Sequence, residues 1–148
     1  MNRLKAKAAV AALGTLALLC VTATSASADG NTWGYVAGTD SGVIRHAITG
    51  SGTDITSQSA KIQLTTGDMI CNYYINWVYL DMNSNPWYTE RAFTNTGCSS
   101  AGGTAGSGQQ YTVASVYRGH GTAKKGYACA YVFTNNAYRG RACVRVGW

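Results

Sequence analysis

From Met69 to Leu80, every second residue is apolar, aromatic or a cysteine. These odd positions are Met69, Cys71, Tyr73, Ile75, Trp77 and Tyr79. A period of two places these residues on one face of an extended strand, whereas a helix would scatter them around its circumference. We therefore expect a strand over 69–80 that turns one apolar face, with Cys71 on it, toward a core.

Shorter apolar segments separated by turn residues extend this pattern. The expected strands are 33–37, 43–48, 60–65, 69–80, 87–94, 111–117, 127–133 and 139–146. Many Gly, Ser, Thr, Asn and Tyr residues suit strands and turns better than helices. The sequence predicts an all-β fold, a small disulfide-stapled antiparallel β-sandwich or barrel-like domain, either as one unit or as two degenerate hairpin repeats. The Gly-, Ser-, Thr- and Ala-rich segment 97–110 is expected to be a flexible loop.

The first 28 residues have the features of a cleavable secretory signal. A cationic start precedes the apolar run 8–21, and 26–28 is an Ala-Ser-Ala cleavage site. The apolar run is shorter than the roughly 20 residues that a membrane-spanning helix needs. We expect a secreted, extracellular protein whose mature part, 29–148, forms a single domain without a membrane span.

Removal of this signal would leave four cysteines, Cys71, Cys98, Cys129 and Cys143. An even number in an oxidising compartment predicts two disulfides, for which three pairings exist. We favour Cys71–Cys98 with Cys129–Cys143 because each pair closes a local hairpin. The cysteines lack the C-x-x-C spacing of zinc sites, so we expect no metal and no other cofactor.

The second of these hairpins predicts specific cross-strand neighbours. A turn at 134–137, with the two strands symmetric about it, places Cys129 opposite Cys143. The same register places Tyr131 opposite Arg141 and Phe133 opposite Arg139. Such pairs can form cation–π contacts across the two strands.

Charge is divided along the mature chain. All six acidic residues precede residue 91, together with only two cations, whereas seven cations and no acid follow from Arg91 onward. The mature net charge is therefore +3. A molecule with this dipole can steer toward an acidic partner.

Candidate catalytic groups are few. The chain has two histidines, His46 and His120, no G-x-S-x-G motif and no phosphate-binding glycine loop. No two acidic residues form a recognisable hydrolytic pair. We therefore expect no enzymatic activity, and we expect His46 to be a hydrogen-bonded strand residue and His120 to lie in a solvated basic loop.

Binding has better support. Tyrosine offers rigid contact area with a polar tip, and Ser, Gly and Asn adapt around it. The candidate partner-binding residues are Trp33, Tyr35, Tyr138, Arg139, Arg141, Arg145 and Trp148. The terminal Trp148 either docks on its own domain or enters a cleft of a partner. Modest charge in a secreted protein argues against nucleic acid as that partner.

In profile, the chain resembles the small bridging subunit of streptomycete umbrella toxin particles. The shared features are the length, the secretory signal, the paired-cysteine hairpins and a polar N-terminal segment. In that family the small subunit connects a lectin-bearing subunit to the toxin stalk. The resemblance implies a non-catalytic adaptor that joins other secreted proteins in an extracellular toxin complex for bacterial antagonism, with 33–48 and 145–148 as contacts.

Two other functions stay open. A secreted protease inhibitor would present Lys124 or Tyr138 at the tip of an exposed, disulfide-braced loop. A carbohydrate-binding module would stack sugars on Trp77, Trp87 or Tyr88. Burial of the two tryptophans would argue against the carbohydrate-binding module.

Overall fold

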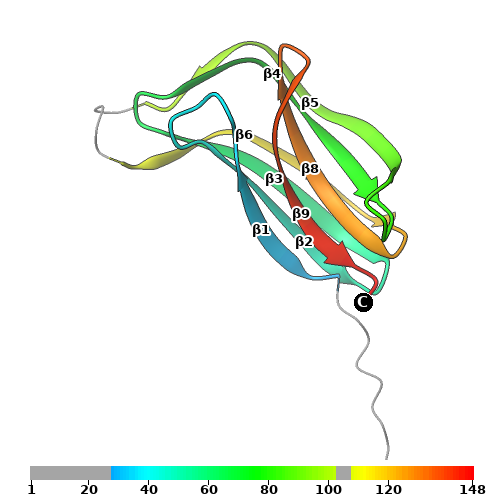
Figure 1. The fold of residues 1–148 in the computed structure, drawn as a ribbon. Helices are drawn as coiled ribbons and strands as arrows, with labels where there is room; N and C mark the ends of the chain where they lie inside the picture. Colours follow the sequence, from blue (N-terminus) through cyan, green and yellow to red (C-terminus); the bar gives the residue numbers. More distant parts are fainter. Residues whose placement is uncertain (1–27, 103–107) are drawn as a thin grey trace, which may run out of the picture.

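The computed structural model describes residues 28–102 and 108–148, and every regular element in these ranges is a β-strand. The strands form two antiparallel sheets that pack face to face (Figure 1). This confirms the expected all-β, disulfide-stapled sandwich. The proposed signal peptide, 1–28, lies outside the described residues except for Ala28.

Sheet A has the order β1-β2-β3-β6, and sheet B has the order β5-β4-β8-β9. The strands of sheet A are β1 (Gly30–Tyr35), β2 (Val43–Ser51), β3 (Asp54–Thr65) and β6 (Gln110–Arg118), with the short β7 (Gly121–Thr122) paired to the start of β3. The strands of sheet B are β4 (Met69–Leu80), β5 (Pro86–Ser100), β8 (Gly126–Thr134) and β9 (Ala137–Val146). Strand β4 thus has the predicted bounds.

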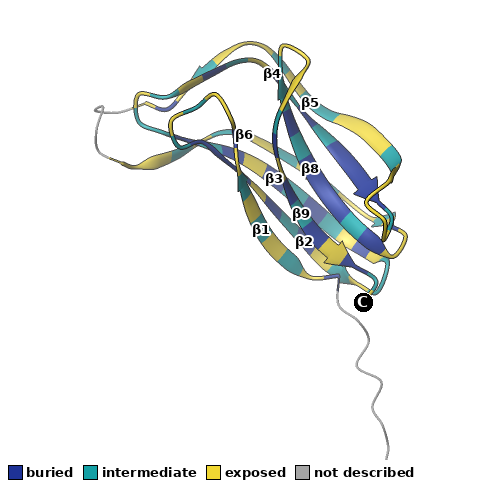
Figure 2. Ribbon diagram, in the orientation of Figure 1, coloured by how far each residue is buried: buried dark blue, intermediate teal, exposed yellow. Residues whose placement is uncertain are grey.

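The core fills the space between the sheets. Its largest buried side chains come from both sheets: Ile44, Ile62, Leu64, Tyr73, Ile75 and Trp77. A second cluster around Ile55, Tyr79 and Val146 fills the end of the sandwich near the C-terminus. Figure 2 shows buried segments along β4 and β8 and exposed segments along β5.

Along one side the backbones of the two sheets meet closely. There the backbone N–H of Ala37 donates to the carbonyl oxygen of Arg139 at 2.7 Å. A Cβ on Gly34 would lie 2.0 Å from the carbonyl oxygen of Arg141, so glycine is required where β1 approaches β9. On the opposite side β5 and β6 end their sheets. The fold is a sandwich closed at one seam, not a barrel.

Both predicted disulfides are present. Cys71 pairs with Cys98 and Cys129 with Cys143, and in each case the two residues lie directly opposite each other on neighbouring strands. Their Cα atoms are 4.0 and 4.1 Å apart. Each bridge closes a hairpin of sheet B, as the cysteine spacing predicts.

The predicted alternation breaks at one residue of β4. Asn72 has φ of 47°, and the register with β5 shifts between Cys71 and Tyr73. This β-bulge exchanges the faces of the residues before it. Ile70 therefore joins the core, Met69 is exposed and Cys71 is half-buried. The prediction that Met69 and Cys71 share the core face of Tyr73 is wrong.

The hairpin of β8 and β9 follows the predicted register up to Val132. Cys129 lies opposite Cys143 and Tyr131 opposite Arg141, as expected. The register then shifts, and Tyr138 rather than Arg139 lies opposite Phe133. Because one extra residue of β9 sits in this irregularity, the prediction of a Phe133–Arg139 pair is wrong.

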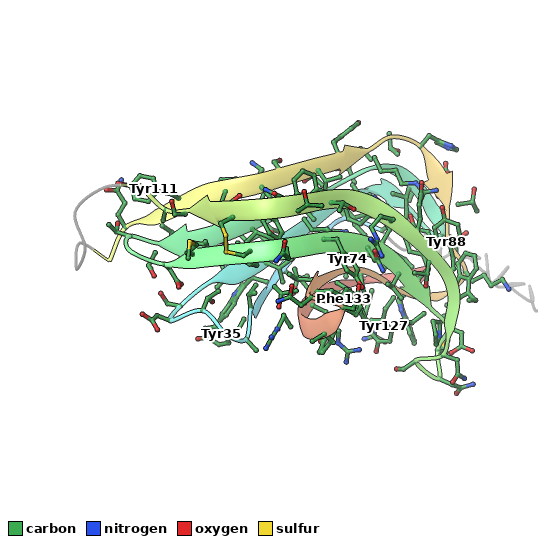
Figure 3. The ribbon with its side chains drawn as sticks, turned by 90° about the horizontal axis from the view of Figure 1, so that it is seen from above. Tyr35, Tyr74, Tyr88, Tyr111, Tyr127 and Phe133 are labelled. Atoms are coloured by element: carbon green, nitrogen blue, oxygen red, sulfur yellow. A yellow bond between two sulfur atoms is a disulfide. The ribbon has the colours of Figure 1, made fainter. Side chains whose placement is uncertain are left out.

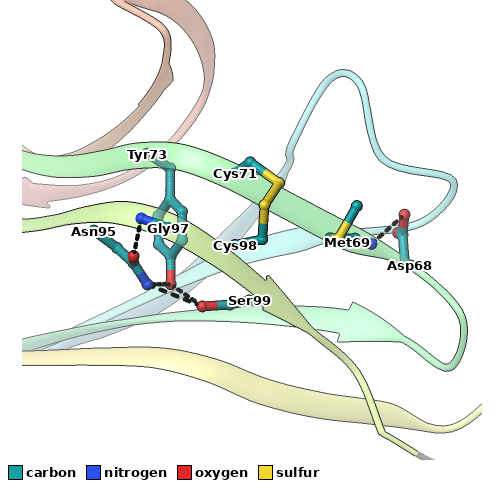
Figure 4. The surroundings of a disulfide bond; sticks show 8 residues. All are labelled: Asp68, Met69, Cys71, Tyr73, Asn95, Gly97, Cys98 and Ser99. Carbon is teal, nitrogen blue, oxygen red and sulfur yellow. Dashed lines mark hydrogen bonds between the residues drawn. A yellow bond between two sulfur atoms is a disulfide. The ribbon is translucent and has the colours of Figure 1, made fainter.

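The prediction of a flexible loop over 97–110 is partly wrong, because both ends of this segment belong to strands. Strand β5 continues to Ser100, and β6 already begins at Gln110. A hydrogen-bond cluster holds the end of β5 (Figure 4), in which Asn95 accepts from the N–H of Gly97 at 2.7 Å and donates to Ser99 at 3.1 Å. The polar residues of this segment therefore stabilise a strand. Residues 103–107 of the predicted loop lie outside the described residues.

Candidate binding face

Sheet B carries a cluster of buried apolar side chains on the face that points away from the core. Antiparallel sheets of a sandwich usually carry polar side chains on that outer face. Here Val78, Leu80 and Cys129 form a separate cluster, and each is at most 5% exposed. In the described part of the chain they are covered by side chains of the same sheet, including Tyr127 and Tyr131, and not by another strand.

Four aromatic rings cross this outer face. Tyr74 and Phe133 stack with ring centroids 4.9 Å apart and planes within 12°. Tyr138 lies 5.9 Å from Phe133 and 5.6 Å from Tyr131, measured between ring centroids. Because β4, β8 and β9 are neighbours, the sheet itself places these rings side by side, as Figure 3 shows for Tyr74 and Phe133.

A guanidinium group lies at each end of this row. The Cζ atom of Arg91 is 3.5 Å from the centroid of the Tyr74 ring. Arg141 lies 5.6 Å from the Tyr131 ring centroid and donates a hydrogen bond of 2.8 Å to its hydroxyl oxygen, which raises the pKa of Arg141. We call these six residues the arginine–aromatic face: Tyr74, Arg91, Tyr131, Phe133, Tyr138 and Arg141.

The C-terminal Trp148 lies beside β9, the outermost strand of sheet B. Its ring contacts two cations, with the Arg145 guanidinium 3.7 Å and the Lys125 ammonium 4.6 Å from its centroid. The preceding Gly147 donates its N–H to the carbonyl oxygen of Gly52 at 2.7 Å. Trp148 stays 40% exposed, so it rests on its own domain without entering the core.

The charged side chains of the arginine–aromatic face and of the neighbouring Trp148 are cations. Within residues 28–102 and 108–148, the two salt bridges are Arg118–Glu90 and His120–Asp54. Neither involves Arg91, Arg141 or Arg145. Aromatic rings orient these guanidinium groups, together with hydrogen bonds from Arg91 to Asn76 and from Arg141 to Tyr131. None of the three has a carboxylate partner among the described residues, so they can bind carboxylates of another molecule.

The structure divides the predicted binding residues into separate groups. Tyr138 and Arg141 belong to the arginine–aromatic face, and Arg145 contacts Trp148. Trp33 and Tyr35 lie in β1, on the other sheet, with their rings perpendicular and 5.0 Å apart. Both are exposed, at 53% and 69%. Arg139 takes no part in the face, because it donates to the hydroxyl oxygen of Thr134 at 2.6 Å.

Sequence reasoning missed four members of the face: Tyr74, Arg91, Tyr131 and Phe133. The sequence shows that Cys129, Tyr131 and Phe133 share one face of β8, but it does not show whether that face points toward the core or away from it. Strand pairing supplies the missing information, because Tyr74 lies directly opposite Phe133.

His46 is buried in β2 beside Trp77, with ring centroids 5.5 Å apart. Neither ring nitrogen of His46 is in hydrogen-bonding geometry with a partner. The prediction that His46 lies in a strand is therefore confirmed, whereas the prediction that its side chain is hydrogen-bonded is wrong. Burial lowers the pKa of His46 to about 4, and nearby Gln58 and the Ala142 backbone oppose this shift only in part. His120 lies on the surface, 2.8 Å from Asp54.

Comparisons of the chain with protein-family models, with curated proteins and with solved structures give no match. Among the described residues, no helix has the length and apolar character needed to cross a bilayer. In the same ranges, no three or more His, Cys, Asp or Glu side chains gather where they could bind a metal ion. A functional assignment therefore has to come from the geometry of the faces.

Proposed function

We propose that the mature chain is a secreted, non-catalytic binding protein, and that another secreted protein docks on its arginine–aromatic face. The supporting observation is a sheet face with aliphatic side chains beneath stacked aromatic rings, bordered by guanidinium groups that form no salt bridge among the described residues. Two disulfides are typical of extracellular proteins and fit this location.

The face has the chemistry of a binding hot spot. Tyrosine and arginine contribute most of the affinity in many interfaces, especially around a desolvated centre. Contacts between rings already hold Tyr74, Phe133 and Tyr131 in place, so binding would cost little side-chain entropy. The arginines favour a partner surface that carries carboxylates.

An adaptor must hold two partners, and sheet A offers a second exposed aromatic pair in Trp33 and Tyr35. Together with the resemblance to umbrella toxin bridging subunits, this arrangement supports an adaptor within an extracellular toxin complex. A lectin-bearing subunit and a toxin stalk are the partners that the resemblance implies.

The two other functions have less support. The Lys124 ammonium lies 5.0 Å from the ring centroid of Trp87, and Tyr138 packs on its own hairpin, so neither resembles the tip of an inhibitory loop. Trp77 is 2% exposed in the core and offers no platform for a sugar. Trp87 is half-buried against Tyr79.

The test is affinity purification of the exported protein from its own culture medium. We expect a stoichiometric protein partner with the wild type and its loss with the double variant Arg91→Gln/Arg141→Gln. Lys124→Gln, in the loop between β7 and β8 and outside both aromatic surfaces, is the matched control and should retain the partner. Recovery of the wild type without any stoichiometric protein, or equal retention by the double variant, would contradict the proposal.

A further inference from the structure

Strand β6 leaves one edge of sheet A open. The sheet ends at β6, and in the part of the chain that the structure describes no strand pairs with its outer side. Residues 111–117, Tyr-Thr-Val-Ala-Ser-Val-Tyr, contain no charge, no proline and no glycine. An exposed edge of this kind presents backbone N–H and C=O groups to any added strand.

The other sheet edges of the molecule are protected. The edge of β1 is covered by β9, which approaches closely at Gly34 and accepts a hydrogen bond from Ala37, just after β1. The edge strand β5 begins with Pro86, carries Glu90 and Arg91, and shifts register against β4 at three places. Proline, charge and bulges are the features by which monomeric sheets avoid edge-to-edge pairing. Strand β6 has no proline, carries a charge only at its last residue, Arg118, and has one register shift against β3.

The side chains of β6 favour coverage as well. Tyr111, Val113 and Val116 pack against the core but stay partly exposed at the open side of the sandwich. Tyr117 is 70% exposed, the largest exposed fraction of any large apolar side chain among the described residues. A strand added to β6 would remove apolar area from water here.

We propose that the occupant of this edge is a second copy of the chain, joined through antiparallel pairing of β6 with β6 about a two-fold axis. A two-fold interface places the same segment on both sides and therefore has to be self-compatible. The segment meets this condition because it is uncharged from Gln110 to Tyr117, and antiparallel pairing sends the two Arg118 side chains to opposite ends. Sheet A would continue from one copy into the other.

This pairing would also serve the proposed adaptor function, on which the following consequence rests. A dimer carries two arginine–aromatic faces, because sheet B is not used in the pairing. Two faces on one particle allow bivalent binding, which raises the overall affinity without any new contact.

The test is sedimentation equilibrium of the exported protein with both disulfides intact, at micromolar concentrations and without any partner. We expect a mass of two chains. The variant Ser115→Lys/Tyr117→Lys places like charges along the paired edge and should weaken association by about tenfold or more. Ser59→Lys is the matched control, because Ser59 pairs with Tyr117 on the same sheet but lies one strand inward, and it should remain dimeric.

Hydrogen exchange gives a second readout that does not depend on the variants. Amides of β6 should exchange more slowly as the protein concentration rises, whereas amides of the other edge strand, β5, should not change. A monomeric wild type, a dimer that the lysine pair leaves intact, or β6 amides insensitive to concentration would each overturn the proposal. None of these results depends on Arg91 or Arg141, so failure here is distinguishable from failure of the proposed function.

Discussion

Acid should destabilise this protein through one buried side chain, His46. The imidazole lies in the core beside Trp77, and its burial lowers the pKa to about 4 from the usual 6.5. The unfolded chain binds a proton at pH values where the folded protein resists it. Stability from this residue is therefore complete above pH 6.5 and falls as the pH decreases toward 4.

The magnitude follows from the two pKa values. Proton linkage gives a loss of about 1.4 kcal/mol in the free energy of unfolding at pH 5.5 and about 3 kcal/mol at pH 4. Small domains have a total stability of roughly 5–15 kcal/mol, so this loss is a large fraction. Other groups also titrate in this range, and the contribution of His46 has to be isolated by substitution.

Urea unfolding of the disulfide-bonded protein at several pH values between about 7.5 and 4 provides the measurement. His46→Leu keeps a similar volume and should reduce the loss of stability at pH 4 by about 3 kcal/mol relative to the wild type. His120→Gln is the control, since His120 is exposed beside Asp54, and should leave most of the pH dependence in place. If His46→Leu lost as much stability as the wild type between the two pH limits, the reasoning from burial would be refuted.

Three further predictions concern the fold and the face. Replacing Cys129 and Cys143 together by alanine should lower the free energy of unfolding by about 3 kcal/mol, because that disulfide closes a short loop. Urea titration of the variant and the wild type measures this difference, and an unchanged unfolding midpoint would contradict the stabilising role of the disulfide. Gly34→Ala should lower the free energy of unfolding by at least about 2 kcal/mol, because the new Cβ would lie 2.0 Å from the carbonyl oxygen of Arg141. Gly102→Ala is the control, since Gly102 has open space around it, and should change the melting temperature little. Similar melting temperatures for the two variants would disprove the close approach of β1 to β9. Arg91→Gln and Arg141→Gln should each cost less than about 1 kcal/mol in thermal unfolding, because both side chains are exposed, and a larger loss would assign them to stability rather than to binding.

The parts of the fold that the sequence predicted are those encoded by local pattern. The period of two over Met69–Leu80 defined β4 with its bounds, and cysteine spacing within hairpins selected the observed disulfides. The bulge at Asn72 escaped because it inserts one residue, and the residues on either side of it still alternate. Asparagine tolerates the left-handed conformation, and before the bulge Ile70 is the one apolar residue at an even position of this segment.

The candidate site was harder to predict because it depends on which strands are neighbours. Tyr138 and Arg141 were chosen from the arginine- and tyrosine-rich end of the chain, and the structure places both on the arginine–aromatic face. Tyr74 and Arg91 come from a different hairpin. Only the pairing of β4 with β8 brings Tyr74 against Phe133. Such a cross-hairpin contact has no trace in residue spacing.

One signal of an unusual outer face was nevertheless present in the sequence. At 77–80, Trp-Val-Tyr-Leu, the alternation of β4 gives way to four consecutive apolar residues, and all four are buried. A continuous apolar run is typical of a strand covered on both faces. In this molecule the core covers Trp77 and Tyr79, while aromatic side chains of the same sheet cover Val78 and Leu80. Because that cover is itself aromatic and bordered by arginines, the outer side of sheet B is the side we expect a partner to bind.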